Sequence, residues 1–161
     1  MRRAALATAD FHIENTAADG IPFWDTGAPG LAAMPDWREA ASRPDNPHEP
    51  VDSSAAVISA QGLLRLGRYL GLESEAGARY WQAGLTAART LFAPPYLSED
   101  PAHQGLILHS IYHRPNGWDY TPPGKRVPQG ESSMWGDYHA MELAVYLMRH
   151  IEGGASLCFW K

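Results

Sequence analysis

Apolar and polar positions along the chain predict helices that are separated by two long loops. Residues 3–15 have the pattern of the end of a helix, and Asn15 is placed to terminate it. Asp52 is expected to cap the next helix, over about 52–70, because a short carboxylate accepts backbone N–H groups that lack partners in the first turn. Apolar residues surround this helix on nearly every side through Leu66, which favours burial on most sides.

Two further helices are predicted, from about 74 to 92 and over 132–150. In the first, apolar residues are spaced by 4, 3 and 4 positions and polar residues occupy the other faces, so one side is expected to face solvent. In the second, the spacing is 4, 3, 4 and 3. The chain is therefore predicted to be all-α. The two stripes are Trp81, Leu85, Ala88 and Phe92, and Met134, Tyr138, Met141, Val145 and Met148.

The loops over 16–51 and 93–130 contain six and seven prolines, respectively. Loops of this length are usually functional or disordered. Apolar residues in the first loop, such as Phe23 and Trp37, argue against disorder. Residues 105–112 form an apolar patch that is too short to predict a helix and is compatible with an extended segment.

Composition and charge exclude several classes of function. The net charge is −5 with no basic run, which argues against nucleic acid as a partner, and no apolar run reaches the roughly 18 residues of a membrane span. Cys158 is the single cysteine, which excludes a disulfide within the chain and a cysteine-rich zinc site. His109 and His113 have no carboxylate at matching spacing, so we expect no metal and no cofactor.

The first residues resemble a secretory signal only faintly, because charged and polar residues from Asp10 onward interrupt the apolar stretch. A cytoplasmic location is therefore expected. A short internal repeat is also visible, in which Trp24-Asp25 and Trp118-Asp119 each precede a proline-rich loop and a helix that opens with two serines. Repeated helical pairs favour a toroid or solenoid, and coincidence is the alternative for so short a match.

Four segments, in one order along the chain, carry a family resemblance. They are DGIPFWD (19–25), DSSAAVISAQGLLRL (52–66), GLILHSIYHRP (105–115) and GESSMWGDYHAMELA (130–144). Together they resemble the C-terminal half of the unsaturated glucuronyl hydrolases, glycoside hydrolase family 88. The related unsaturated rhamnogalacturonyl hydrolases are the nearest alternative.

The resemblance implies a fold and an activity. The fold is an (α/α)₆ toroid of helical hairpins, in which the helices from residues 52 and 132 are inner and the helix from 74 and the one before residue 15 are outer. The family removes unsaturated uronic acid from oligosaccharides that polysaccharide lyases produce. An aspartic acid protonates the C4=C5 vinyl ether, water adds to C5, and the hemiketal collapses to release the remaining sugar.

The family's two active-site aspartates would lie upstream of the matching segments, and residues 1–19 contain no equivalent. No catalytic residue is therefore assigned to this chain. Residues 1–161 are expected to be a single domain or a fragment that is inactive alone. A non-catalytic helical remnant, which binds sugar weakly or packs against a partner, is the alternative.

Six Trp and seven Tyr suit a sugar-binding cleft, with packing as the alternative. Ser132 and Ser133 open a helix, where backbone N–H groups and the helix dipole favour an anion such as the acidic sugar. A plain N-cap is the alternative for these serines.

Further candidates for substrate binding follow the serines or lie in the loops. Trp135 is a candidate for stacking on a sugar face, and Asp137 and Tyr138 for hydrogen bonds, with core packing and a hydrogen bond to a loop as the alternatives. Trp24 and Asp25 are candidates at the mouth of the sugar-binding pocket, and Asp25 is equally suited to fixing its own loop. His113 is a candidate at the rim of the pocket.

The expected ligand is an unsaturated uronic-acid oligosaccharide. Part of a toroid leaves helices without neighbours, so a homo-oligomer or a complex with a missing N-terminal half is also expected. The apolar residues predicted to face such a neighbour are Val57, Ile58, Leu63, Leu64 and Leu66.

Overall fold

The computed structural model describes residues 1–155, and Cys158 lies outside them. The α-helices are α1 (Arg2–Glu14), α2 (Ser53–Leu70), α3 (Glu75–Leu91) and α4 (Met134–Ile151). The two long loops contain short 3₁₀ helices, η1 (Pro29–Ala33) and η2 (Arg114–Asn116). Between residues 1 and 155 there are two isolated β-bridges, Phe23 with Val51 and Leu97 with Ile107, and no longer strand. The predicted all-α fold and its main helices are confirmed.

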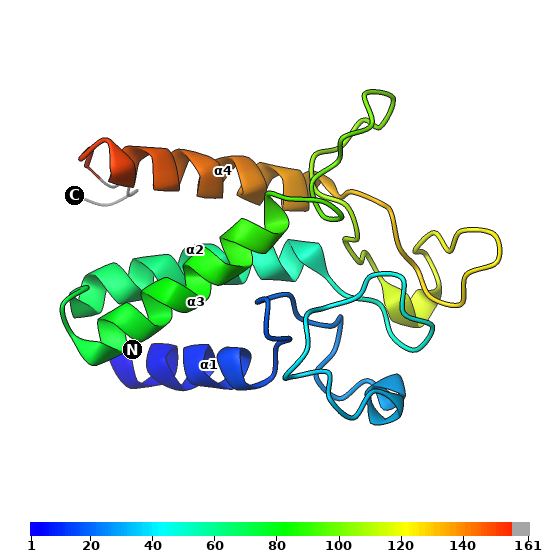
Figure 1. The fold of residues 1–161 in the computed structure, drawn as a ribbon, viewed down its shortest axis with the longest axis horizontal. Coiled ribbons are helices and arrows are strands. Elements are labelled where there is room, and N and C mark those ends of the chain that lie inside the picture. The colour runs from blue at the N-terminus through cyan, green and yellow to red at the C-terminus, as the bar shows by residue number, and fades with distance from the viewer. Residues whose placement is uncertain (156–161) are drawn as a thin grey trace.

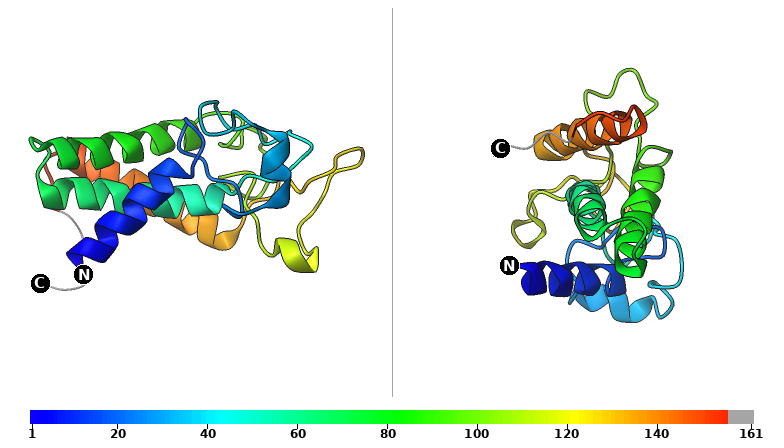
Figure 2. Two further views of the ribbon diagram at one scale, coloured as in Figure 1. Left: turned by 90° about the horizontal axis from the view of Figure 1, so that it is seen from below. Right: turned by 90° about the vertical axis from the view of Figure 1, so that its left-hand side faces the viewer.

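The helices form a stack in which α2 and α3 lie between α1 and α4 (Figures 1 and 2). α2 contacts all three other helices. α2 and α3 meet closely at glycines: a Cβ on Gly84 would lie 2.7 Å from Leu64 Cγ, and one on Gly67 would lie 2.8 Å from the Gly77 carbonyl oxygen. The absence of side chains at these positions therefore lets the two helices pack backbone to backbone.

α1 is attached mainly by polar contacts, because none of its residues is buried. The Asp10 carboxylate accepts a hydrogen bond from the Tyr80 hydroxyl at 2.7 Å and pairs with Arg79, both on α3. The hydrogen bond from the Arg79 guanidinium is the main cause that holds the pKa of Asp10 below its usual value, and the hydrogen bond from Tyr80 acts in the same direction. α1 thus lies at the edge of the stack, where its Asp10 contacts α3.

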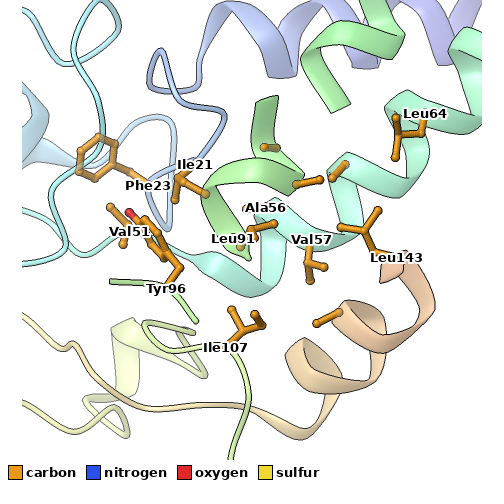
Figure 3. Close-up of a cluster of buried hydrophobic side chains, with 14 of the residues drawn as sticks. Ile21, Phe23, Val51, Ala56, Val57, Leu64, Leu91, Tyr96, Ile107 and Leu143 are labelled. Atoms are coloured by element: carbon orange, nitrogen blue, oxygen red, sulfur yellow. The ribbon is translucent and has the colours of Figure 1, made fainter. Parts of the chain in front are cut away.

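The core extends from the helices into both long loops (Figure 3). Ile21 and Phe23 enter it from the first loop, and Tyr96 and Ile107 from the second. The Tyr96 hydroxyl, almost fully buried, contacts Ser42 Oγ at 2.5 Å. The proline-rich loops are therefore part of the folded unit, as the apolar residues of the first loop indicated.

One expectation about apolar faces is wrong, and α4 shows an arrangement that its spacing did not specify. Val57, Leu63 and Leu64 are buried within this chain instead of facing an open flank, since α3 and α4 cover them; Ile58 remains 45% exposed. The stripe that predicted α4 faces away from the other helices, and the buried residues of α4 come from its opposite side. Those buried residues are Gly136, Ala140, Leu143 and Tyr146.

Candidate functional site

The N-termini of α2 and α4 lie together at the end of the stack where the long loops gather (Figure 1). A Cβ on Gly136 would lie 2.9 Å from Ser110 Oγ and 3.4 Å from the Cβ of Ser54. The second loop bridges the two helix starts, because Ser53 N–H donates to the His109 carbonyl at 3.1 Å and Ser110 N–H to the Glu131 carbonyl at 3.0 Å. Residues far apart in the sequence therefore form one surface here.

Asp52 is the N-cap of α2, as predicted. Its Oδ1 accepts hydrogen bonds from the N–H groups of Ser54 at 3.0 Å, Ala55 at 3.3 Å and Ile111 at 3.3 Å. Burial raises the pKa of Asp52, and these hydrogen bonds oppose that rise. Asp52 thus fixes the second loop to the start of α2.

The two serines at the start of α4 have different partners. Ser133 is the N-cap, and its Oγ accepts from Gly136 N–H at 3.1 Å, which confirms the alternative proposed for it. Ser132 Oγ lies 2.8 Å from His103 Nε2. Ser132 and His103 therefore form a half-buried polar pair beside the helix N-terminus.

Beside this helix start, four rings form a connected group that we term the aromatic platform: Tyr112, His113, Trp118 and Trp135. Ring centroids lie 5.6 Å apart for Tyr112 and Trp118, 5.4 Å for Tyr112 and Trp135, and 5.1 Å for His113 and Trp118. Tyr112 and Trp118 are stacked and about 60% exposed. The structure thus brings the predicted residues His113 and Trp135 together through two rings that were not predicted as site residues.

A carboxylate holds the platform in place. Asp119 accepts hydrogen bonds from the N–H groups of Tyr112 and His113, the latter at 3.1 Å. His113 Nδ1 accepts from Asn116 N–H at 3.2 Å, at the start of η2. The backbone that carries these rings is therefore fixed, which reduces the entropy lost when a ligand binds to them. The Trp-Asp repeat was the only sequence signal for Trp118 and Asp119.

Asp137 and Tyr138 do not join the platform contacts. Both carboxylate oxygens of Asp137 accept from Leu106 N–H at 3.0 Å, and Oδ1 also accepts from Ile107 N–H at 3.0 Å. This is the loop hydrogen bond that was the alternative for Asp137. Tyr138 is 62% exposed, and its ring meets the His139 ring edge to face.

Trp24 and Asp25 both support the first long loop. Trp24 Nε1 donates to Glu49 Oε2 at 2.8 Å, and the other oxygen of this buried glutamate accepts from Gly30 N–H at 2.8 Å. Asp25 Oδ1 accepts from Gly27 N–H at 2.6 Å. Glu49 is an organising residue that the sequence did not reveal, because nothing local marks a carboxylate that acts across a loop.

The two stacked rings of the platform are exposed at the surface. Three surface hollows, of about 290, 430 and 510 Å³, are lined by residues of the first long loop and of α3, and none of the three includes a platform residue. Within residues 1–155, no group of three or more His, Cys, Asp or Glu is arranged to hold a metal ion. Nor does any helix of that part have the length and apolar content to cross a membrane.

Comparisons with known proteins identify similar sequences and structures, although no protein-family model matches the chain. The curated unsaturated glucuronyl hydrolase of Bacillus sp. (strain GL1) is 25% identical over 135 residues, which cover 84% of this chain and 29% of that enzyme. The crystal structure of unsaturated glucuronyl hydrolase from Bacillus sp. GL1 superimposes with a TM-score of 0.67 at 24% identity, over 93% of this chain and 33% of that one.

A variant of the Streptococcus agalactiae unsaturated glucuronyl hydrolase superimposes with a TM-score of 0.60 at 21% identity, over 85% of this chain and 30% of that one. This chain therefore spans about a third of the length of the relatives that it matches. The structural likeness covers 93% of this chain, and the fold is part of an α/α toroid. In sequence and in fold, the chain is similar to the unsaturated glucuronyl hydrolases, and its fold matches a portion of their helical toroid.

Proposed function

We propose that this chain supplies a sugar-contacting part of a glycoside hydrolase toroid that acts on unsaturated uronic-acid oligosaccharides. Its relatedness to unsaturated glucuronyl hydrolases supports the reaction class. One neighbouring structure is a UGL variant with dGlcA-Glc-Rha-Glc, an unsaturated oligosaccharide. The observation that carries the proposal is the aromatic platform, because exposed stacked rings on a fixed backbone at the helix starts offer faces for sugar rings.

The chemistry around the platform suits an acidic sugar. Aromatic faces pack against the C–H faces of a sugar ring, and their burial by a ligand contributes hydrophobic free energy. Trp135 joins the platform to the first turn of α4, where helical N–H groups and the dipole favour a carboxylate. The Ser132–His103 pair at the same helix start adds hydrogen-bonding groups. Ser132 and Ser133, Trp135 and His113 remain the proposed contacts, joined by Tyr112 and Trp118.

Trp118→Ala is expected to weaken binding of an unsaturated disaccharide by roughly tenfold or more, about 1.4 kcal/mol, because it removes an exposed ring that contacts both Tyr112 and His113. Binding is measured by NMR titration of the full chain with a disaccharide from polysaccharide lyase digestion. Tyr69→Ala is the control, since Tyr69 is an exposed aromatic ring on α2 that is not part of the platform. Equal affinity in the Trp118 variant and the wild type would remove the platform from the site.

The full chain by itself is expected not to hydrolyse the unsaturated disaccharide. Asp119 and Asp137 each accept two or more hydrogen bonds from backbone N–H groups, so both carboxylates are engaged in holding the second long loop. The assay follows the ultraviolet absorbance of the C4=C5 bond. Turnover would mean that a carboxyl group of this chain, with Asp25 and Asp137 the first to replace by Asn, supplies the acid.

A second candidate function is packing against a partner without catalysis. The observation that favours it is an apolar side of α4 that is exposed to solvent. The opposite side of the same helix carries its buried residues. Absence of sugar binding in the wild type, together with a stable association, would favour this function.

A further inference from the structure

His109 joins the two segments that carry rings of the aromatic platform. Its imidazole is buried, Nδ1 accepts a hydrogen bond from Gly130 N–H at 3.1 Å, and Nε2 lies 3.2 Å from the Pro95 carbonyl oxygen. Tyr112 follows His109 by three residues, and Trp135 follows Gly130 by five residues. The bond at Nδ1 therefore lies where the segment of Tyr112 meets the segment of Trp135.

The backbone at His109 is held from two sides. Its carbonyl accepts from Ser53 N–H at 3.1 Å, and the next residue, Ser110, donates to the Glu131 carbonyl at 3.0 Å. Within residues 1–155, His109 is the one non-glycine residue with a positive φ, 71°, a conformation that persists only where the surrounding structure holds it. The bend at His109 is thus fixed between the start of α2 and the segment that leads into α4, and it sets the course of the chain towards Tyr112.

The hydrogen bonds of the imidazole require one protonation state. Nδ1 accepts from a backbone N–H and so carries no proton, which leaves the proton of the neutral ring on Nε2, facing the Pro95 carbonyl oxygen. A second proton would enter at Nδ1 and point at the Gly130 N–H, so that two donors would face each other. The bond between His109 and Gly130 therefore exists only with the neutral ring, and burial lowers the pKa of His109, which favours that ring.

Other titratable side chains lie on the elements that pack against His109. The Tyr96 ring meets the imidazole at a centroid distance of 5.6 Å, and the charge of Asp45 favours the protonated imidazole, although burial outweighs it. Asp52, at the start of α2, and the exposed Glu131 lie on the two segments that bond to His109. Asp52 is the alternative source of a pH response, because its carboxylate accepts a backbone N–H of the segment that follows His109.

We propose that His109 is a positioning residue for sugar binding: its neutral ring holds Trp135 and the start of α4 beside Tyr112, and protonation of the ring releases this contact. The effect on sugar binding rests on the function proposed above, whereas the contact between the two aromatic rings does not. In an open loop the imidazole accepts a proton near the ordinary histidine pKa of about 6.5. Opening therefore becomes more favourable as the pH falls below this value.

NMR of the wild-type full chain without sugar tests the positioning role and depends on no variant. As the pH falls from about 7.5 to about 4.5, the nuclear Overhauser contact between Tyr112 and Trp135 is expected to disappear with the same midpoint as the titration of the His109 ring, below about 6.5. The contact between Tyr112 and Trp118, within one segment, is expected to persist. A Tyr112 contact with Trp135 that outlasts protonation of the ring, a ring that stays neutral throughout, or simultaneous loss of both contacts would overturn the proposal.

Affinity for the unsaturated disaccharide tests the consequence. One proton linked to binding changes the affinity by up to about tenfold per pH unit below the midpoint, so the wild type is expected to weaken by up to that factor. His109→Asn, which tolerates the left-handed backbone and does not titrate, is expected to stay nearly constant. This variant retains His103 and His113, whose protonation would attract an acidic sugar, so the difference between the two profiles isolates His109.

Two outcomes of the affinity measurement contradict the positioning role. One is an equal pH profile in the wild type and His109→Asn, and the other is a pH response that Asp52→Asn abolishes, which would assign the response to that carboxylate. Absence of sugar binding at every pH, together with the expected loss of the ring contact in NMR, would refute the proposed function and leave the positioning role supported.

Discussion

Replacement of Leu64 by alanine is expected to lower the free energy of unfolding by about 2–5 kcal/mol, the largest effect of any single truncation considered for this chain. Leu64 is fully buried, and a Cβ on Gly84 of α3 would lie only 2.7 Å from its Cγ. The variant therefore leaves a cavity between α2 and α3. Urea denaturation followed by circular dichroism measures the loss. Ile58→Ala, on the same helix but 45% exposed, is the control and should lose much less.

The contact between Leu64 and Gly84 also predicts how substitutions at the two positions combine. Gly84→Ala alone is expected to destabilise the fold, because the new methyl group meets Leu64 and the Ala60 carbonyl oxygen, the latter at 3.0 Å. In the Leu64→Ala background the methyl group enters the cavity instead, so the double variant should be more stable than the sum of the two single losses predicts. Strict additivity of the two losses would show that α2 and α3 do not meet at these residues.

His109→Asn is expected to cost about 1–3 kcal/mol, because it removes two part-buried hydrogen bonds between the imidazole and the backbone. His109 Nδ1 accepts from Gly130 N–H at 3.1 Å, and Nε2 lies 3.2 Å from the Pro95 carbonyl oxygen, so one imidazole joins two distant parts of the second loop. The residue has a left-handed backbone, with φ of 71°. Asparagine tolerates that backbone but is too short to reach both groups. Thermal unfolding measures the loss, and an unchanged melting temperature would contradict the bridging role.

The same histidine predicts a pH dependence. Burial lowers the pKa of His109, so as the pH falls this imidazole takes up a proton in the unfolded chain at a higher pH than in the folded chain. The stability that the neutral ring contributes is fully present above the unfolded pKa of about 6.5 and is lost as the pH falls through and below it. Burial lowers the pKa of His12 in the same direction. The stability lost between about pH 7.5 and about pH 5.5 should therefore be smaller in His109→Asn than in the wild type, and an equal loss would contradict this assignment.

The local sequence was sufficient to predict the helices and their capping residues. Asp52, Ser133 and Asn15 end or begin helices at the expected places, because capping depends on side chains within three or four residues of the helix end. The stripe of α3 was also assigned correctly, since its polar residues leave one apolar face. α4 differs because both of its faces are apolar, and the more regular one is exposed. Periodicity identifies a helix, but it does not identify which of two apolar faces meets the core.

The candidate site could be predicted only in part for a related reason. His113 and Trp135 were recognised from their place in the family-like segments, whereas Tyr112 and Trp118 join them through ring contacts that depend on the fold of the loop. Asp137 was suited equally to a sugar and to a loop, and the tertiary structure places the loop N–H groups of Leu106 and Ile107 against it. By itself, the sequence determined the helices, their caps and the family resemblance, because these depend on neighbouring residues. Only the tertiary structure decided which carboxylates are bound to backbone, which rings meet and which side of α4 is open, because each depends on segments that are distant in the chain.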